Sequence, residues 1–316
     1  MGALVVRRLA GMVLTLLVTS FLVFASVYVA PGDPRDLLLR GRSPSPEMVA
    51  AVTKQYGLDD PFWLQYWHWL TGALHLDFGR SLQFHEEVGT LIAARLPTTL
   101  GLIAMSAVII SVVGLGIGIV GALQAGRPSD RVLLVLTTIL AAVPAFVAAI
   151  VLISVFAVRL GWFPTYGAGS GLGDRIHHLF LPSVALSLTF VALVSRVTRS
   201  SMLEELGREH VEVALSRGLS RRSVVRRHVL RNALGPILTI TGLLVAGLLV
   251  TSAVVETAFA LNGVGSLLVQ SVDTQDFAIV QAIVLLVAAA FVVVNTAVDL
   301  AYPFIDPRVR AGSTAR

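Results

Sequence analysis

Stretches without a charged side chain dominate this sequence and predict its helices. A bilayer core about 30 Å thick is crossed by roughly 20 helical residues, each adding about 1.5 Å of rise. Five uncharged stretches pass that length, and a sixth, residues 179–195, comes close to it. We therefore predict six transmembrane helices. In chain order, the uncharged stretches are residues 9–30, 96–126, 132–158, 179–195, 232–255 and 277–298.

Two segments are ambiguous by hydropathy alone. Residues 257–272 are fairly apolar, but Asn262 and two nearby glycines interrupt them, so we expect a loop with a short helix on the membrane surface. Arg7 and Arg8 stand before the first apolar stretch, as in a signal peptide. That stretch is longer than a typical signal h-region and has no clear small-residue cleavage site after it, so we expect the helix to be retained.

Composition supports a membrane class. Of the 316 residues, 55% are hydrophobic and only 14% are charged, which is too little charge to cover the surface of a soluble domain of this size. The sequence therefore indicates an all-α integral membrane protein. It contains no cysteine, which excludes a disulfide framework and a thiolate metal site.

The basic residues predict how the chain is oriented. If the N-terminus is inside, the inner segments carry 16 of the 24 Lys and Arg residues, including nine arginines between positions 196 and 231. Six of the eight outer basic residues lie in the long segment 31–95, and long loops count little in the positive-inside rule. The reverse orientation would put the arginine cluster outside. We therefore predict that both termini are cytoplasmic.

The external segment 31–95 is too long to be a simple connection. A helix is expected at 45–57, because Ser45 can cap it, Pro46 suits its first position and Gly57 can end it. Amphipathic aromatic residues follow it and indicate either a belt that packs the segment onto the bilayer and the helix bundle, or a platform for an external partner. These residues are Trp63, Tyr66, Trp67 and Trp69.

Sequence motifs for catalysis are absent. A phosphate loop needs Gly-Lys-Ser/Thr, and the only lysine, Lys54, stands between Thr53 and Gln55. The segment "HEEVG" at 85–89 lacks the second histidine of a zinc protease, and "GAGSGLG" at 167–173 lacks the glycine spacing of a nucleophile elbow. We expect no catalytic residue, no metal site and no nucleotide site, so any ATP that drives this protein binds another subunit.

Small residues suggest close helix packing in the second uncharged stretch. Gly114 and Gly118 are four residues apart, and Gly121 lies on the next turn. This spacing lets transmembrane helices approach each other closely. We expect these glycines to pack against neighbouring helices, some of them in a partner subunit.

The arginine-rich stretch begins with an ordered pattern. Acidic residues, among them Glu212, come first, and Arg217 and Gly218 follow. This order suits a short helix whose dipole favours early acids and whose end needs a left-handed residue. Ala214 offers a small surface beside Leu215. We predict a short cytoplasmic helix and a sharp turn. The later arginines alone are also explained by a loop held at anionic lipid, at about 1 kcal/mol for each cation near the surface.

The segment "EVALSRG" at 212–218 resembles the Glu-Ala-Ala…Gly signature of ABC importer permease subunits, with Val213 in place of the second residue. "RHVLRNALGP" at 227–236 resembles the dipeptide/oligopeptide/nickel permease subfamily, whose proline stands later than usual. Other segments resemble that subfamily in order along nearly the whole chain. They include "APGDP" at 30–34, "DFGRSL" at 77–82, "RLGWFP" at 159–164, "VVETAFALNGVG" at 254–265 and "AYPFIDPRVR" at 301–310.

The resemblance implies a type I ABC importer permease fold in a bacterial inner membrane. Residues 1–95 would hold the first transmembrane helix and the external segment, residues 96–303 the permease domain, and residues 304–316 a cytoplasmic tail. The short helix with Glu212, Ala214, Leu215 and Gly218 would be the coupling helix that fits a groove on an ATPase. Two ATPase subunits or domains would bind ATP and Mg, a second similar permease would complete the pore, and an external binding protein would deliver substrate. No nucleic-acid partner is implied.

The sequence leaves two questions open: which substrate is transported, and whether ATP or an ion gradient drives the transport. The subfamily moves dipeptides, oligopeptides, nickel, glutathione or haem, and a peptide is the favoured expectation. An ion-coupled secondary transporter acting alone would need ionisable groups at the bilayer midplane. Glu256 and Asp299 lie at the ends of apolar stretches instead. Glu256 could meet a substrate ammonium, but its position favours an interfacial helix end.

Overall fold

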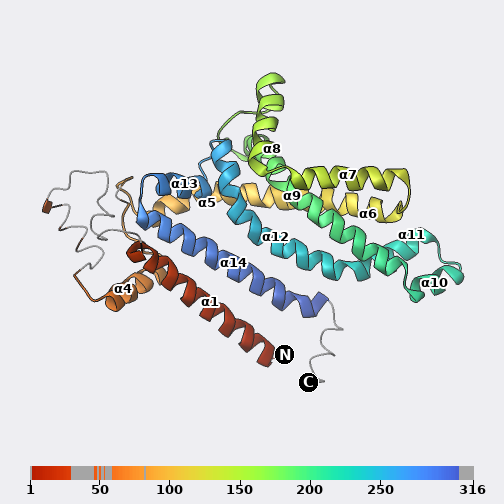
Figure 1. Ribbon diagram of the computed structural model, residues 1–316, viewed down its shortest axis with the longest axis horizontal. Coiled ribbons are helices and arrows are strands. Elements are labelled where there is room, and N and C mark those ends of the chain that lie inside the picture. Colours follow the sequence, from red (N-terminus) through yellow and green to blue (C-terminus); the bar gives the residue numbers. More distant parts are fainter. Residues whose placement is uncertain are drawn as a thin grey trace. The chain divides into compact units, whose positions relative to one another are not determined.

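The computed structural model describes residues 2–29, 59–81 and 83–305, together with positions 46, 47, 50 and 53. The helix predicted at 45–57 falls almost wholly outside these residues, as does most of the predicted tail. Helices make up most of what is described (Figure 1). They are α1 (Gly2–Val29), α4 (Phe62–Leu74), α5 (Val88–Ile109), α6 (Leu115–Leu123), α7 (Pro128–Ala142), α8 (Ala145–Leu152), α9 (Leu172–Leu206), α10 (Glu209–Ser216), α11 (Arg221–Val224), α12 (Leu230–Ala258), α13 (Val264–Asp273) and α14 (Phe277–Ile305), with π-helical segments η1 (Ile110–Gly114), η2 (Ile153–Arg159) and η3 (Val225–Val229).

The chain forms two compact units. The first contains Met1–Thr99 and Leu261–Val293, and the second contains Leu100–Ala260 and Val294–Arg316. α5 and α14 each contribute residues to both units.

In the first unit, the aromatic helix α4 packs on α1. Phe21 of α1 meets the rings of Phe62, Trp63 and Tyr66, with centroids 5.5–6.1 Å apart. The hydroxyl groups of Ser20 and Tyr66 also hydrogen-bond at 2.8 Å. These contacts support the prediction that the aromatic segment packs onto the helices.

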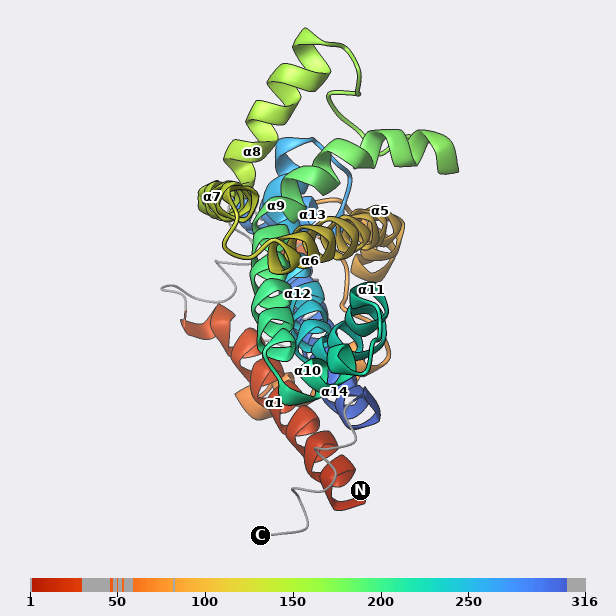
Figure 2. The ribbon, with the colours of Figure 1, turned by 90° about the vertical axis from the view of Figure 1, so that its right-hand side faces the viewer.

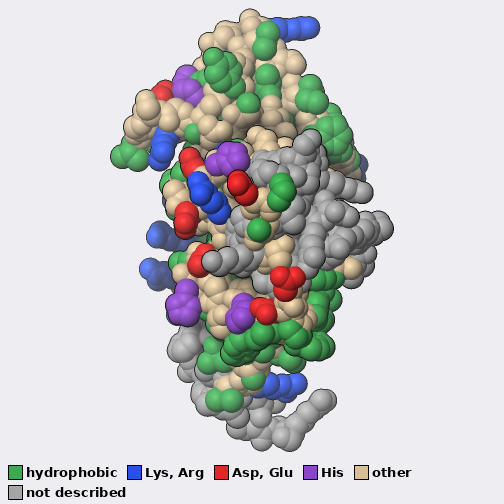
Figure 3. Space-filling view, turned by 90° about the vertical axis from the view of Figure 1, so that its left-hand side faces the viewer, with side chains coloured by type: hydrophobic (Ala, Val, Ile, Leu, Met, Phe, Trp, Pro, Cys, Tyr) green, Lys and Arg blue, Asp and Glu red, His purple; other side chains and the backbone are tan. Residues whose placement is uncertain are grey.

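One side of α4 stays open. Trp63 is 69% exposed, and Trp67 and Leu74 are exposed too. α4 lies at the left of Figure 1, and Figure 3 views the molecule from that side, with hydrophobic side chains gathered in the lower half of the face. These exposed aromatic rings fit both interpretations: a belt at the membrane interface, or a binding surface for an external partner.

The core of the first unit lies among the start of α5, α13 and α14. Val88 and Ile92 pack with Leu267, Ile279 and Ile283, all buried. Hydrogen bonds also link these helices and the segments that lead into them. Thr99 Oγ1 accepts a hydrogen bond of 2.8 Å from the backbone N–H of Val264, and Ser81 Oγ donates one of 2.6 Å to Asp276. The short helix expected within 257–272 is thus observed as α13.

The second unit is built around α9. α6, η1, α7, α8 and α12 all contact it. α6 and α7 run side by side next to α9, and α10 and α11 lie at the end of this unit where α9 ends and α12 begins (Figures 1 and 2). α9 is 35 residues long, so it extends well beyond the uncharged stretch 179–195 that predicted it. Its ends carry charged residues that the sequence criterion could not include.

Among the described residues, four helices are long and apolar enough to span a membrane: Val6–Ser26, Val88–Leu123, Leu172–Leu206 and Phe277–Ala297. α12 contains the whole of the predicted stretch 232–255, and among the residues described in full its Gly247–Ala258 part is a shorter apolar helix. The count of six spans and the orientation of the termini therefore remain predictions.

The prediction of one continuous helix at 132–158 is wrong. Pro128–Ala142 and Ala145–Arg159 meet at an angle of 100°, as a broken span or a re-entrant loop. Pro144 stands at the break, and Val143 before it is extended, at φ −82° and ψ 117°. A proline ring disfavours the helical conformation in the preceding residue, and proline offers no N–H to the previous turn. With this pair counted as one, the candidate spans become five.

Candidate functional site

The short helix α10 has clear start and stop signals. Arg208 precedes it in an extended conformation, and Glu209 and Glu212 occupy its first turn, where acids suit the helix dipole. Gly218 follows its end at φ +80°, the left-handed conformation predicted for it. The N–H groups of Gly218 and Leu219 donate to the carbonyls of Leu215 and Ala214, at 2.9 and 3.3 Å. This pair of hydrogen bonds is the Schellman motif, which satisfies carbonyls that a helix end leaves open.

One face of α10 is seated on its own chain. Val211 is 2% exposed and Ala214 is 8% exposed. They belong to a cluster of buried residues from α6, α9, α11, η3 and α12, including Ala122, Met202, Val224, Val229 and Ala233. Ala214 therefore packs inward, so the small surface expected there faces this chain. Glu212, Val213 and Leu215 point outward and remain exposed.

A buried carboxylate fastens the ends of three helices. Glu205, in the last turn of α9, receives a contact of 2.9 Å from Arg208 Nε at the start of α10. Its second oxygen accepts a hydrogen bond of 3.2 Å from Asn232 Nδ2 in the first turn of α12, and His210 Nε2 of α10 lies 3.8 Å away. Glu205 is 6% exposed. Glu205 is one of the acids that precede Arg217 in the arginine-rich stretch, but no local pattern predicted its contact with Asn232.

The π-helical turn η3 sets which way the arginines face. Val224, Val229 and Ala233 are buried, and the spacing of five between the first two matches the wider π turn. Because these apolar residues keep one face inward, the arginines between them lie on the exposed side. The exposed arginines are Arg221, Arg222, Arg226, Arg227 and Arg231.

The three glycines predicted to mediate packing all face α9 of the same chain. A Cβ atom on Gly114 would lie 3.0 Å from the side chain of Val194. One on Gly118 would lie 2.5 Å from Thr198 Cβ and 2.6 Å from the carbonyl oxygen of Ser195. One on Gly121 would lie 3.3 Å from Arg199 Cδ. In the described structure these positions are used within the chain, so contact with a partner permease at them stays a prediction.

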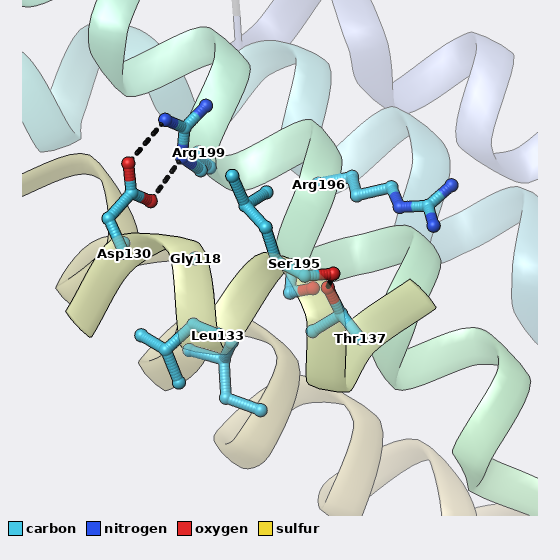
Figure 4. A pocket seen from close by; sticks show the side chains of 10 residues that line it. Gly118, Asp130, Leu133, Thr137, Ser195, Arg196 and Arg199 are labelled. Atoms are coloured by element: carbon cyan, nitrogen blue, oxygen red, sulfur yellow. Dashed lines mark hydrogen bonds and ion pairs between the residues drawn. The ribbon is translucent and has the colours of Figure 1, made fainter. Parts of the chain in front are cut away.

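An ion pair lies beside these glycines (Figure 4). Arg199 reaches from α9 to Asp130 at the start of α7, with nitrogen–oxygen distances of 2.8 and 2.7 Å. Asp130 is 3% exposed and also accepts a hydrogen bond of 3.1 Å from the N–H of Gly126. A bidentate pair of this kind fixes orientation as well as charge. The partners are 69 positions apart in the sequence, so no local pattern predicted their contact.

The remaining candidate residues form no arrangement typical of a catalytic or metal-binding site. Glu256 lies two residues before the end of α12 and is fully buried in the second unit. The glycine-rich segment 167–173 forms turns, with positive φ at Gly167, Gly169 and Gly171, before α9 begins. Within the described residues, no group of three His, Cys, Asp or Glu residues could hold a metal ion.

Known proteins resemble the chain over nearly its whole length. Residues 114–311 match the family described as binding-protein-dependent transport system inner membrane component, and residues 1–103 match the N-terminal region described for such membrane components. The protein called glutathione transport system permease protein GsiC is 39% identical in Salmonella typhi and 38% identical in Escherichia coli K12. Each alignment spans 306 residues, 97% of this chain and 98% of the relative.

A solved structure shares the fold. The MetNI methionine ABC transporter, in an inward-facing conformation, has a chain that superposes with a TM-score of 0.55 at 18% identity. The match covers 68% of this chain and 96% of that one. Together with its several apolar helices, these matches identify a multi-pass protein of the bacterial inner membrane. The chain belongs to the binding-protein-dependent transport system inner membrane components, the permease subunits of ABC importers of the peptide, glutathione and nickel type.

Proposed function

We propose that this permease subunit forms part of the import path for short peptides, glutathione among them. Glutathione is itself a tripeptide, so the name of the relatives and the expected peptide class describe related chemistry. The observation that carries the proposal is the 39% identity over 97% of this chain with a glutathione permease. Import of nickel or haem by the same machinery remains the alternative.

Within this function, α10 is the coupling helix that docks on the ATPase. Its support is geometric, because the helix is held firmly on one face and open on the other. Val211 and Ala214 fix it to α9 and α12, while Val213 and Leu215 are both exposed apolar side chains outside that buried face. Glu212 and Gly218 lie on the same exposed part of the chain.

The partners follow from the family in general and are proposed here in detail. An importer of this type works with ATPases and an external binding protein. We assign to this chain two ATPase subunits or domains, which bind ATP and Mg, and a second homologous permease. This chain itself would bind no cofactor.

Uptake into proteoliposomes tests the function. The chain would be purified with the permease, ATPase and binding protein encoded beside it and reconstituted as a complex. Labelled glutathione, a dipeptide, an oligopeptide and Ni²⁺ would be offered separately. We expect accumulation of a peptide-class substrate only with ATP, the binding protein and an intact ATPase. Accumulation by this chain alone under an ion gradient, or uptake of Ni²⁺ and not of peptides, would contradict the proposal.

A further inference from the structure

We propose that Glu205 is a positioning residue that joins the coupling helix to two membrane helices, so that movement of α10 becomes movement of α9 and α12 together. The inference rests on the proposed function of α10 and assigns a role to a residue outside the signature segment 212–218.

The contacts of Glu205 divide between the helices. One carboxylate oxygen lies 2.9 Å from Nε of Arg208, the residue immediately before α10. The other oxygen accepts the 3.2 Å hydrogen bond from Asn232, in the first turn of α12. Because Glu205 itself belongs to the last turn of α9, a single carboxylate bridges three elements.

The apolar cluster beneath α10 cannot provide the same link by itself. Val211 and Ala214 touch their neighbours through small or branched apolar groups, which hold by close packing and have no preferred direction. Charge-assisted hydrogen bonds are directional and about twice as strong as neutral ones. Only Glu205 is buried here, since the Arg208 side chain is 42% exposed, so salt screens this pair in part. Glu205 thus supplies the directional contacts among α9, α10 and α12, and we call this set of contacts the Glu205 joint.

Glu204 provides a natural comparison on the same turn. Its carboxylate also pairs with Arg208, at 2.9 Å from Nη2, but its side chain is 72% exposed. Exposed ion pairs contribute little. Loss of charge at Glu204 therefore tests the pairing with Arg208 alone, while loss of charge at Glu205 tests the joint.

The experiment measures coupling in the complete reconstituted complex. Substrate imported for each ATP hydrolysed would be compared for wild type, Glu205→Gln and the control Glu204→Gln. We expect Glu205→Gln to assemble and hydrolyse ATP but to lower this ratio by about fivefold or more, the lower end of typical allosteric coupling. Glu204→Gln should stay within about twofold of wild type.

A second readout follows the joint directly. Spin labels on cysteines introduced at Ser216 of α10 and Val250 of α12, both exposed and in the same unit, would report the distance between the helices. We expect one narrow distance in wild type and a broader distribution in Glu205→Gln when ATP binds. The chain has no native cysteine, so only the partner subunits need replacement of theirs.

Asn232→Ala keeps the experiment decisive if Glu205→Gln fails to assemble. Asn232 is exposed, so its loss should leave the fold intact and remove only the arm to α12. We expect a smaller fall in the same ratio. Wild-type ratios in Asn232→Ala and Glu205→Gln, or an equal fall in Glu204→Gln, would overturn the proposal. A wild-type complex that shows no ATP-driven import would instead count against the proposed function.

Discussion

Gly118→Ala adds a single methyl group at the closest contact between α6 and α9. The new Cβ would lie 2.5 Å from Thr198 Cβ and 2.6 Å from the carbonyl oxygen of Ser195. Neither atom can rotate away, because the position of Thr198 Cβ is set by the backbone of α9 and the carbonyl oxygen is part of that backbone. The two helices must therefore separate locally or the chain must distort.

The expected cost can be compared with a nearby control. Overpacking a well-filled interior typically costs about 1–3 kcal/mol, and the two contacts at 2.5 and 2.6 Å place Gly118→Ala at about 3 kcal/mol. Alanine gains back about 1 kcal/mol in helix propensity over glycine. The net loss is then about 2 kcal/mol. Gly116→Ala is the matched control, since Gly116 lies in the same helix, is exposed and has nothing within 4 Å of the position that a methyl group would take.

Thermal unfolding of the purified complex measures the difference. A loss of about 2 kcal/mol corresponds to a fall of about 4–8 °C in the apparent Tm of a domain of this size class. Gly116→Ala should leave the Tm unchanged or raise it slightly, because only the propensity gain applies. Equal Tm values for the two variants would refute the reasoning that α6 and α9 approach through Gly118.

Three further predictions use the same unit. Arg199→Ala should destabilise the complex more than Asp130→Ala, because it leaves the more deeply buried partner without its counter-charge. Thermal unfolding of both single variants and the double variant measures this, and equal losses would contradict it. Gly218→Val should abolish coupled ATP hydrolysis while the complex still assembles, since a β-branched residue resists φ +80°; normal stimulation by substrate and receptor would contradict it. Thr198→Val should leave the Tm unchanged or raise it, because the buried Thr198 Oγ1 has no hydrogen-bond partner among the described residues; a clear fall in Tm would show that the hydroxyl does bind something.

The uncharged stretches predicted where helices would lie better than how those helices are shaped. Hydropathy located the centre of α9 but not its charged ends, since a criterion based on missing charge stops at the first arginine or acid. The 100° break was signalled by Pro144, yet hydropathy treats proline as one more uncharged residue. Reading Pro144 by its backbone restrictions would have found the break.

The candidate site was predictable only where its signals are local. Gly218 and the acids of α10 act within a few residues of sequence, so the helix and its turn could be expected. The inward position of Ala214 could not, because it depends on the side chains of α9 and α12 that pack around it. The Glu205–Asn232 and Asp130–Arg199 contacts join residues 27 and 69 positions apart, and no local pattern marks such pairs.

Cross-linking from α10 tests the central claim most directly. A cysteine at Leu215, on the exposed face, and one at Val211, on the buried face, would be introduced separately into this cysteine-free chain within the assembled complex. Single cysteines placed along the expected groove of the ATPase would complete each pair. The account predicts rapid disulfide formation from Leu215→Cys, none from Val211→Cys, and loss of transport that reduction restores. Failure of Leu215→Cys to cross-link to any ATPase position, in a complex that imports substrate, would contradict the account.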